Sequence, residues 1–302
     1  MSAVVLQSRE VMATHARSFR WASWFLPSEC RDDAAVVYAL CRLIDDTADE
    51  ADNADTARAE LKTIQLELNG AQPPRPLVAA FLEVATRTDM NLSYADELIE
   101  GVLSDLGNVC FETDAQLLRY SYRVAGTVGL MMCPIIGVQD DTGRAHAIDL
   151  GVAMQLTNIC RDVLEDAGRQ RVYLPVERLE KAGVDVRRLL SELGQGAQVA
   201  TVVRDILQMA EEYYRSAEDG MRFIPARSRF AILVASRLYR AIGLRLLVNG
   251  ANPMAGRTWI GGPGKLYWVV RALMTFVIRR TDARPHDPRL HRPLMGLPDV
   301  NI

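Results

Sequence analysis

The stretch from residue 155 to residue 166 reads Gln-Leu-Thr-Asn-Ile-Cys-Arg-Asp-Val-Leu-Glu-Asp. Four of its polar residues recur at intervals of three or four: Gln155, Asn158, Asp162 and Asp166. On a helix these residues share one face. The flanking residues are apolar, and polar groups on a buried face are costly unless they bond to something. The stretch therefore predicts a buried helix with a functional polar stripe, with an ordinary exposed helix face as the alternative.

A second acidic block of the same design lies roughly a hundred residues earlier, within residues 38–49. Asp45 and Asp49 are four residues apart, as are Asp162 and Asp166, so each pair projects its carboxylates from one side of a helix. Like charges at this spacing destabilise a helix slightly unless a cation lies between them. Carboxylate oxygens that leave room for phosphate oxygens are the usual ligands of Mg²⁺. Two such blocks predict a magnesium-dependent site for a diphosphate.

For the first block alone, a solvated acidic helix end is the alternative, because further acidic residues follow it.

Tyr38 and Arg42 fall on the same helical stripe as Asp45 and Asp49. A guanidinium between carboxylates can orient them and can also bind a phosphate through paired hydrogen bonds. We therefore expect Arg42 to lie at the diphosphate site.

The composition limits the classes of protein to which the chain can belong. Its 302 residues, 49% of them apolar, can bury a sizeable core, and a formal net charge of −3 gives no reason to expect nucleic-acid binding. The five cysteines are scattered and lack metal-type spacing, as in a reducing cytoplasmic compartment. No signal-peptide pattern is present, and the apolar run 266–278 is shorter than the roughly 20 residues of a spanning helix. We therefore expect a cytoplasmic protein, attached at most to a membrane surface.

Nearly every segment shows the periodicity of an amphipathic helix, and the breaks between segments carry glycine and proline. No set of alternating strand patterns appears, and no strand leads into a dinucleotide-binding glycine turn. We expect one all-α domain over residues 1–280 and an irregular tail rich in Pro, Arg and His over residues 281–302. The expected helices cover residues 11–25, 32–47, 56–68, 77–86, 94–108, 114–133, 145–165, 200–221, 227–247 and 266–280.

Residues 120–129, Tyr-Ser-Tyr-Arg-Val-Ala-Gly-Thr-Val-Gly, place two glycines inside an expected helix. Each glycine costs a helix about 1 kcal/mol relative to alanine. Their presence predicts close approach to the backbone, by another helix or by a bulky apolar ligand. Both can hold if the ligand lies between helices.

Taken together, these motifs resemble the squalene/phytoene synthase family. The resemblance rests on residues 15–19, 38–49, 124–129, 155–166 and 171–175, which occur in the family's order across about residues 10 to 260. It implies an all-α, isoprenoid-synthase-type helical bundle around a central cavity. It also implies head-to-head joining of two prenyl diphosphates through a cyclopropylcarbinyl diphosphate.

The resemblance assigns roles to individual residues. The expected ligands of Mg²⁺, with Mn²⁺ as a substitute, are Asp45, Asp49, Asn158, Asp162 and Asp166. The expected catalytic residues are Tyr38, Arg42, Tyr173 and the four aspartates. The expected substrate-binding residues are His15, Ser18, Phe19, Tyr120, Val124, Val128, Gly129, Gln155, Asn158, Arg161, Tyr239 and Arg257. The match at Arg257 needs a one-residue gap.

Within the family, the length and the 169–175 segment favour condensation of two geranylgeranyl diphosphates to phytoene, without NADPH. A C30 synthase that uses farnesyl diphosphate and makes dehydrosqualene, squalene or presqualene diphosphate is the alternative, because one or two unlocated side chains at the tunnel floor decide chain length. Head-to-tail prenyl transferases and terpene cyclases share the aspartates but not the 124–129 and 155–158 strings. A non-enzymatic relative is a further alternative, but it would be expected to lack some of the four aspartates, and all four are present in this sequence.

The late segment 265–280 is apolar and basic, and residues 257–292 hold eight Lys or Arg against two Asp. Such a helix can lie on an anionic membrane surface, and a final core helix is the alternative. The expected partners are thus prenyl diphosphates, a membrane surface and downstream enzymes of the pathway, but no nucleic acid.

Overall fold

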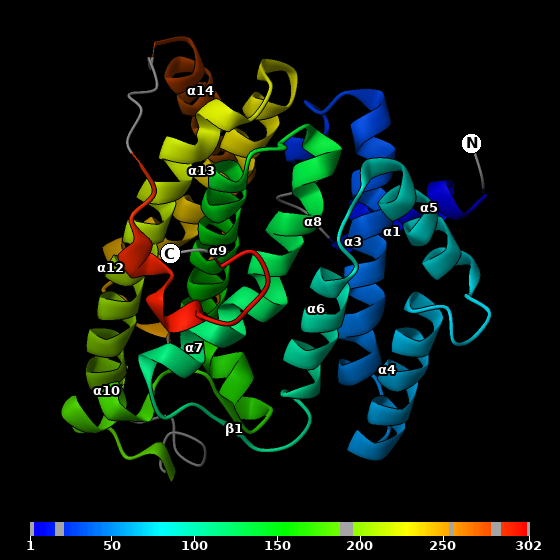
Figure 1. Cartoon of the computed structure of the whole chain (residues 1–302). Coiled ribbons are helices and arrows are strands. Elements are labelled where there is room, and N and C mark those ends of the chain that lie inside the picture. The colour runs from blue at the N-terminus through cyan, green and yellow to red at the C-terminus, as the bar shows by residue number, and fades with distance from the viewer. Residues whose placement is uncertain (1–2, 16–20, 188–195, 254–255, 279–284, 301–302) are drawn as a thin grey trace.

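The computed structural model describes residues 3–15, 21–187, 196–253, 256–278 and 285–300. These residues form an all-α bundle, as expected, with α9 (Asp141–Gly168) running through its middle (Figure 1). Helices α12 (Gly196–Gly220), α13 (Ala226–Val248) and α8 (Thr127–Ile136) pack directly on α9. The helix that carries the polar stripe is therefore the core helix of the fold.

The other helices complete the bundle around these four. They are α1 (Ala3–His15), α3 (Ser28–Asp49), α4 (Ala54–Leu68), α5 (Pro76–Thr88), α6 (Ser93–Leu103), α7 (Asp114–Ser121), α10 (Val176–Lys181) and α14 (Gly262–Ile278). The short helical turns are η1 (Tyr122–Gly126), η2 (Met221–Phe223), η4 (Pro288–Leu290) and η5 (Arg292–Leu294). A two-residue parallel pair, β1 (Val109–Cys110) with β2 (Arg171–Val172), closes the end of the bundle where α9 stops.

Local chemistry sets the ends of α9. The Asp140 side chain accepts a hydrogen bond from the backbone N–H of Thr142 at 2.7 Å, which satisfies a free donor at the helix start. Long runs of buried apolar residues then hold the helix among its neighbours, and it ends at Gly168. The 28-residue α9 is longer than the helix expected over 145–165, and α3 likewise exceeds 32–47.

The expected helix over 114–133 is interrupted. It consists of α7, the π-helical turn η1 and α8 in succession. A π-helical turn adds a residue to one helical turn and commonly occurs beside functional sites. The expected helix over 11–25 begins earlier, because α1 starts at Ala3; residues 16–20 lie outside the described residues, and residues 21–23 are helical.

The glycines of this region let helices pack at backbone distance. A Cβ atom added at Gly151 would lie 2.3 Å from the carbonyl oxygen of Ala125, and one added at Gly129 would lie 2.4 Å from that of Ala147. Contacts this short leave no room for a side chain. Helix packing therefore requires glycine at both positions, and for Gly129 the sequence pattern predicts it.

The C-terminal segment, residues 285–300, lies across α7 and α9 (red in Figure 1). It has no α-helix, but it is anchored to the bundle: His291 and Leu294 are fully buried, and the Tyr213 hydroxyl donates to the carbonyl of Leu290 at 2.8 Å. Arg119 of α7 donates to the carbonyl of Met295 at 2.9 Å. The described part of the tail is thus an ordered component of the core.

The Gly151→Ala variant should unfold more easily, because its new methyl group would overlap the Ala125 carbonyl. We expect the free energy of unfolding to fall by about 3 kcal/mol. Gly168→Ala is the matched control on the same helix, since a Cβ there meets nothing within 4 Å. Urea denaturation followed by circular dichroism measures both, and equal stability of the two variants would contradict the packing argument.

Candidate active site

A cavity with about 1600 Å³ of empty space, open solvent at its mouth included, lies between α3, α8, α9 and α13. Most of its wall is apolar. Eight of the residues expected at the site line it: Tyr38, Asp45, Val124, Val128, Gly129, Gln155, Asn158 and Tyr239. The polar stripe of α9 thus meets the Tyr38–Asp45 face of α3 across this space. The cavity can take a long apolar chain with a polar group at one end.

The Asp45 side chain lines the open cavity, but the surrounding helices shield its carboxylate from bulk water. This desolvation raises the pKa of Asp45 to about 7, with further contributions from Asp49 and Asp105 and an opposing one from Arg42. Arg42 itself forms an ion pair with Asp46, one turn further on. The guanidinium therefore stands beside the acidic block, as expected, but in this structure it is bound to the neighbouring carboxylate.

Asp49, the last residue of α3, links the two acidic blocks. Its carboxylate accepts hydrogen bonds from Arg169 at 2.9 Å and from Arg171 at 3.1 Å, and both arginines follow directly after α9. The C-terminal ends of α3 and α9 are thereby held together at one end of the cavity.

The acidic block of α9 is also flanked by arginines. Asp162 accepts a hydrogen bond from the Nε of Arg161 at 2.8 Å, and Arg257 approaches it to 3.2 Å. Burial raises the pKa of Asp166 to about 7, with the charges of Asp162 and Glu165 adding to it. These guanidiniums can bind a diphosphate once cations neutralise the carboxylates.

Asn158 carries an unsatisfied acceptor at this end. Its Nδ2 donates to Gln155 at 3.3 Å, but its buried Oδ1 has no hydrogen-bond partner in the described part of the chain. A free amide oxygen beside carboxylates fits a hard divalent cation. Among the described residues, however, no three carboxylates of the two blocks place their oxygens within 4.8 Å of one another. A cation here would therefore need further oxygen ligands, which the phosphates of a substrate can supply.

Asp105, just after α6, was not predicted from the sequence. It accepts hydrogen bonds from Tyr120 at 2.7 Å and from Tyr173 at 2.8 Å, and the two rings stack with centroids 5.0 Å apart. Burial raises its pKa to about 6, against the effect of the two hydroxyls, and its charge acts on both Asp45 and Asp166. Asp105 thus lies between the acidic blocks. It is a single acid in an apolar stretch with no partner at helical spacing, so the sequence offers no signal for it.

The remaining expected residues are placed as follows. Arg257 forms ion pairs with Asp162 and Glu165, so it does lie at the acidic end. His15 is the last residue of α1, and Ser18 and Phe19 lie outside the described residues.

A helical bundle that encloses an apolar cavity with carboxylates and arginines at one end is typical of one enzyme class, the isoprenoid synthases. Comparison with known proteins narrows this class. The sequence profile described as Squalene/phytoene synthase matches residues 12–262, and the chain belongs to this family.

Several relatives carry the name 15-cis-phytoene synthase, and two of them illustrate the similarity. That of Enterobacter agglomerans is 37% identical over 92% of this chain and 97% of its own length. That of Paracoccus sp. (strain N81106 / MBIC 01143) is 40% identical over 83% of this chain and 84% of its own. A crystal structure of a dehydrosqualene synthase in complex with ligand superimposes with a TM-score of 0.83 at 25% identity, covering 91% of this chain and 97% of that one.

The raised pKa values make stability depend on pH in the metal-free protein. Folded Asp45 has a pKa of about 7 against an ordinary value of 3.8, so between these values the folded state binds more protons. Stability from this group therefore falls as pH rises through that interval. The Asp45→Asn variant, neutral throughout, should be more stable than wild type at pH 8, and this advantage should become smaller as the pH falls to 5. Melting temperatures in EDTA test this, with Asp52→Asn on the exposed loop after α3 as the control. An equal effect of Asp45→Asn at both pH values would contradict the assignment.

Proposed function

We propose that the protein condenses two molecules of geranylgeranyl diphosphate head to head to phytoene, through prephytoene diphosphate. As a member of this family it is a prenyltransferase. The observation that carries the proposal is the cavity, whose mostly apolar wall includes Asp45 of α3 and Gln155 and Asn158 of α9, the latter one turn before Asp162. Phytoene synthases that match most of the chain, among them those of Enterobacter agglomerans and Paracoccus sp., support the C40 product.

The site residues divide the chemistry among them. Asp45, Asp49, Asn158, Asp162 and Asp166 would hold Mg²⁺, or Mn²⁺ in its place. When bound, the metal would neutralise the diphosphate leaving groups. Arg161 and Arg257 can bind phosphate oxygens at the same end, and the apolar wall keeps water from a carbocation.

The reaction is balanced without a reductant. Loss of diphosphate from one substrate gives an allylic cation, which the double bond of the second substrate attacks, and loss of one proton closes the cyclopropane. Loss of the second diphosphate, rearrangement and loss of a second proton give phytoene. Tyr38 and Tyr239 face the cavity near Asp45, where their rings can stabilise the cation. Asp105 holds the Tyr120 and Tyr173 hydroxyls in place beside the acidic blocks.

Formation of a C30 product from two farnesyl diphosphates is the second candidate, because the fold matches the dehydrosqualene synthase closely. Purified protein with Mg²⁺ and either diphosphate, with and without NADPH, distinguishes the two when products are identified by mass spectrometry. We expect a C40 triene from geranylgeranyl diphosphate, independent of NADPH. If only a C30 product formed, the protein would be a C30 synthase that uses farnesyl diphosphate.

Replacing Asp162 with alanine should abolish turnover and leave the helical circular dichroism spectrum intact. The carboxylate is partly buried and paired with Arg161 and Arg257 rather than with the apolar core, so its loss removes a cation ligand without opening the core. Asp55→Ala, in the exposed first turn of α4, should keep wild-type turnover. Near-native turnover of the Asp162 variant would show that the metal assignment is wrong.

We also propose that α14 contacts an anionic membrane, into which a hydrocarbon product would pass. No helix in the described ranges is both long and apolar enough to span a bilayer. The inner face of α14 packs on α13, with the rings of Phe276 and Phe230 5.7 Å apart. The outer face exposes large apolar side chains at helical spacing: Leu266, Val270, Leu273 and Val277. Lys265 and Arg271 are its charged residues, and no acidic residue occurs between 257 and 278.

A variant carrying Leu273→Glu and Val277→Glu should lose sedimentation with phosphatidylglycerol vesicles, because charge on the apolar face opposes insertion. Leu6→Glu, at a similarly exposed leucine on α1, is the control and should sediment like wild type. Binding that survives the α14 changes would exclude this face as the membrane contact.

A further inference from the structure

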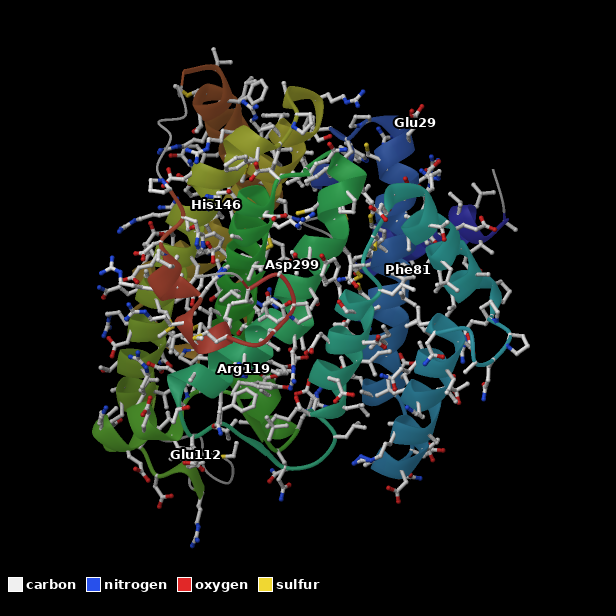
Figure 2. All side chains as sticks on the ribbon, viewed as in Figure 1. Glu29, Phe81, Glu112, Arg119, His146 and Asp299 are labelled. Atoms are coloured by element: carbon white, nitrogen blue, oxygen red, sulfur yellow. The ribbon has the colours of Figure 1, made fainter. Side chains whose placement is uncertain are left out.

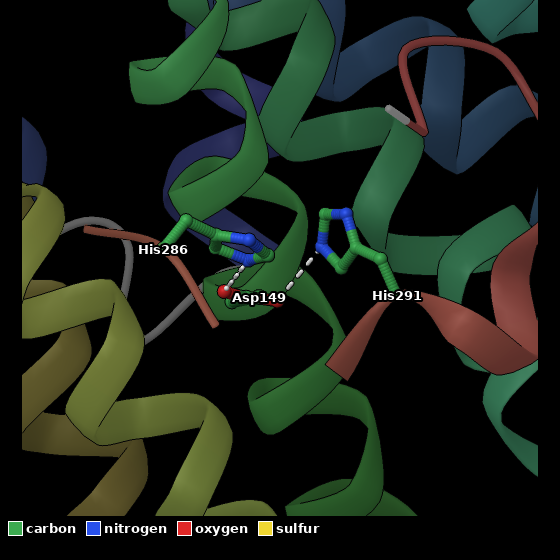
Figure 3. Close-up of side chains that lie close together, drawn as sticks. All are labelled: Asp149, His286 and His291. Atoms are coloured by element: carbon green, nitrogen blue, oxygen red, sulfur yellow. Dashed lines mark hydrogen bonds and ion pairs between the residues drawn. The ribbon is translucent and has the colours of Figure 1, made fainter. Parts of the chain in front are cut away.

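Three of the four histidines of the chain gather around one buried carboxylate, away from the acidic end of the cavity. Asp149 on α9 is fully buried, and the Nε2 atoms of His286 and His291 lie 2.9 and 3.0 Å from its two oxygens (Figure 3). The two imidazoles approach different oxygens, at hydrogen-bond distances, so they act as donors to the carboxylate. These contacts hold the pKa of Asp149 below its ordinary value, although burial alone would raise it. Both histidines belong to the C-terminal segment, which is thereby fastened to the core helix.

The third histidine, His146, joins this network through Ser216 of α12. The Ser216 hydroxyl donates to Asp149, so its oxygen is free to accept from the Nδ1 of His146 at 2.9 Å. His146 therefore carries its proton on Nδ1. Its buried Nε2 has no hydrogen-bond partner in the described part of the chain. Burial lowers the pKa of His146 to about 4, so the ring is neutral near pH 7.

The His146 ring also forms part of the cavity wall. It lines the cavity together with Val138, Gly143, Gly220 and Met221. Asn158, at the acidic end of the same cavity, lies twelve residues further along α9, which corresponds to about 18 Å. Figure 2 shows His146 toward the end of the bundle where α13 and α14 lie, whereas Glu112, next to β1, marks the opposite end. His146 thus stands in the part of the cavity remote from the diphosphate site, one turn from Gly143.

The position of His146 is fixed on two sides. A Cβ atom at Gly220 would lie 2.2 Å from the Cβ of His146, so the side chain packs against bare backbone. On its other side the bond to Ser216 sets the direction of the ring. A side chain this constrained cannot withdraw to admit a longer ligand.

We propose that His146 is a specificity-determining residue that closes the remote end of the cavity and limits the length of the prenyl chain. Asp149 acts as a positioning residue, because it holds the His146 ring through Ser216 and is itself held by His286 and His291. This inference rests on the proposed function, since it concerns the chain of the same substrate. Prenyl diphosphates of different length have the same head group, so a length limit has to arise where the chain ends.

The test compares kcat/KM for farnesyl, geranylgeranyl and geranylfarnesyl diphosphates, which carry C15, C20 and C25 chains. Removing the ring in His146→Ala should raise the C25-to-C20 ratio roughly tenfold, the scale on which a pocket discriminates chains that differ by a few carbons. Ser216→Ala, which only frees the ring, should shift the ratio in the same direction by a smaller factor. Ser228→Ala is the matched control, because this buried serine has no hydrogen-bond partner in the described residues and does not line the cavity. Its ratio should equal that of wild type.

A second pair of variants tests the positioning role. His291→Ala removes a donor to Asp149 and should shift the chain-length ratio, whereas His291→Gln, which keeps an N–H donor, should restore the wild-type ratio. A merely structural role would lower the melting temperature without moving this ratio.

The outcomes distinguish failure of the specificity assignment at His146 from failure of the proposed function. An unchanged ratio in folded His146→Ala overturns the specificity assignment; if that variant does not fold, an unchanged ratio in Ser216→Ala does so. Absence of condensed product from all three diphosphates with the wild-type protein contradicts the proposed function instead.

Discussion

Mutual repulsion among carboxylates at one end of an apolar cavity is the constraint around which this structure is arranged. Burial raises the pKa values of Asp45, Asp105 and Asp166, and the charge of Asp105 raises those of Asp45 and Asp166 further. Arginines offset part of the repulsion from outside, with Arg171 bound to Asp49 and acting on Asp166. The charges remain incompletely compensated, which is the state that favours uptake of divalent cations and a diphosphate.

Holding such an end together requires rigid supports, and α9 supplies the main one. Gly151 of α9 and Gly129 of α8 let the backbones of η1 and α8 come within contact distance of α9, so the helix cannot shift without steric overlap. Ala147 and Gly151, the α9 residues at these contacts, also line the cavity. Helix packing therefore fixes the cavity wall directly, and the 28-residue length of α9 connects the diphosphate end to the remote end.

The parts that the sequence predicts are those determined locally. Helical spacing placed Gln155 and Asn158 on one face, and the structure shows both on the cavity wall. The all-α class followed from the same periodicity. Contacts between distant segments produce no periodic pattern in the sequence, so they were not predicted. Asp105 bonds to Tyr173 across 68 residues, and Asp149 bonds to His291 across 142. For the same reason, the composition of the tail suggested irregular chain, whereas its described part is anchored by buried long-range bonds that composition does not encode.

The division of the cavity into a charged end and a closed end explains how one family can make products of different length. The charged end meets the same diphosphate in every substrate, so its residues cannot distinguish a C15 from a C20 chain. Discrimination has to come from wall positions that the head group never reaches, and on α9 these lie about three turns before Asn158. There the wall is His146, which is fixed by bonds to α12 and, through Asp149, by the C-terminal segment. Residues at the end of the chain can therefore alter substrate length and leave the acidic site untouched.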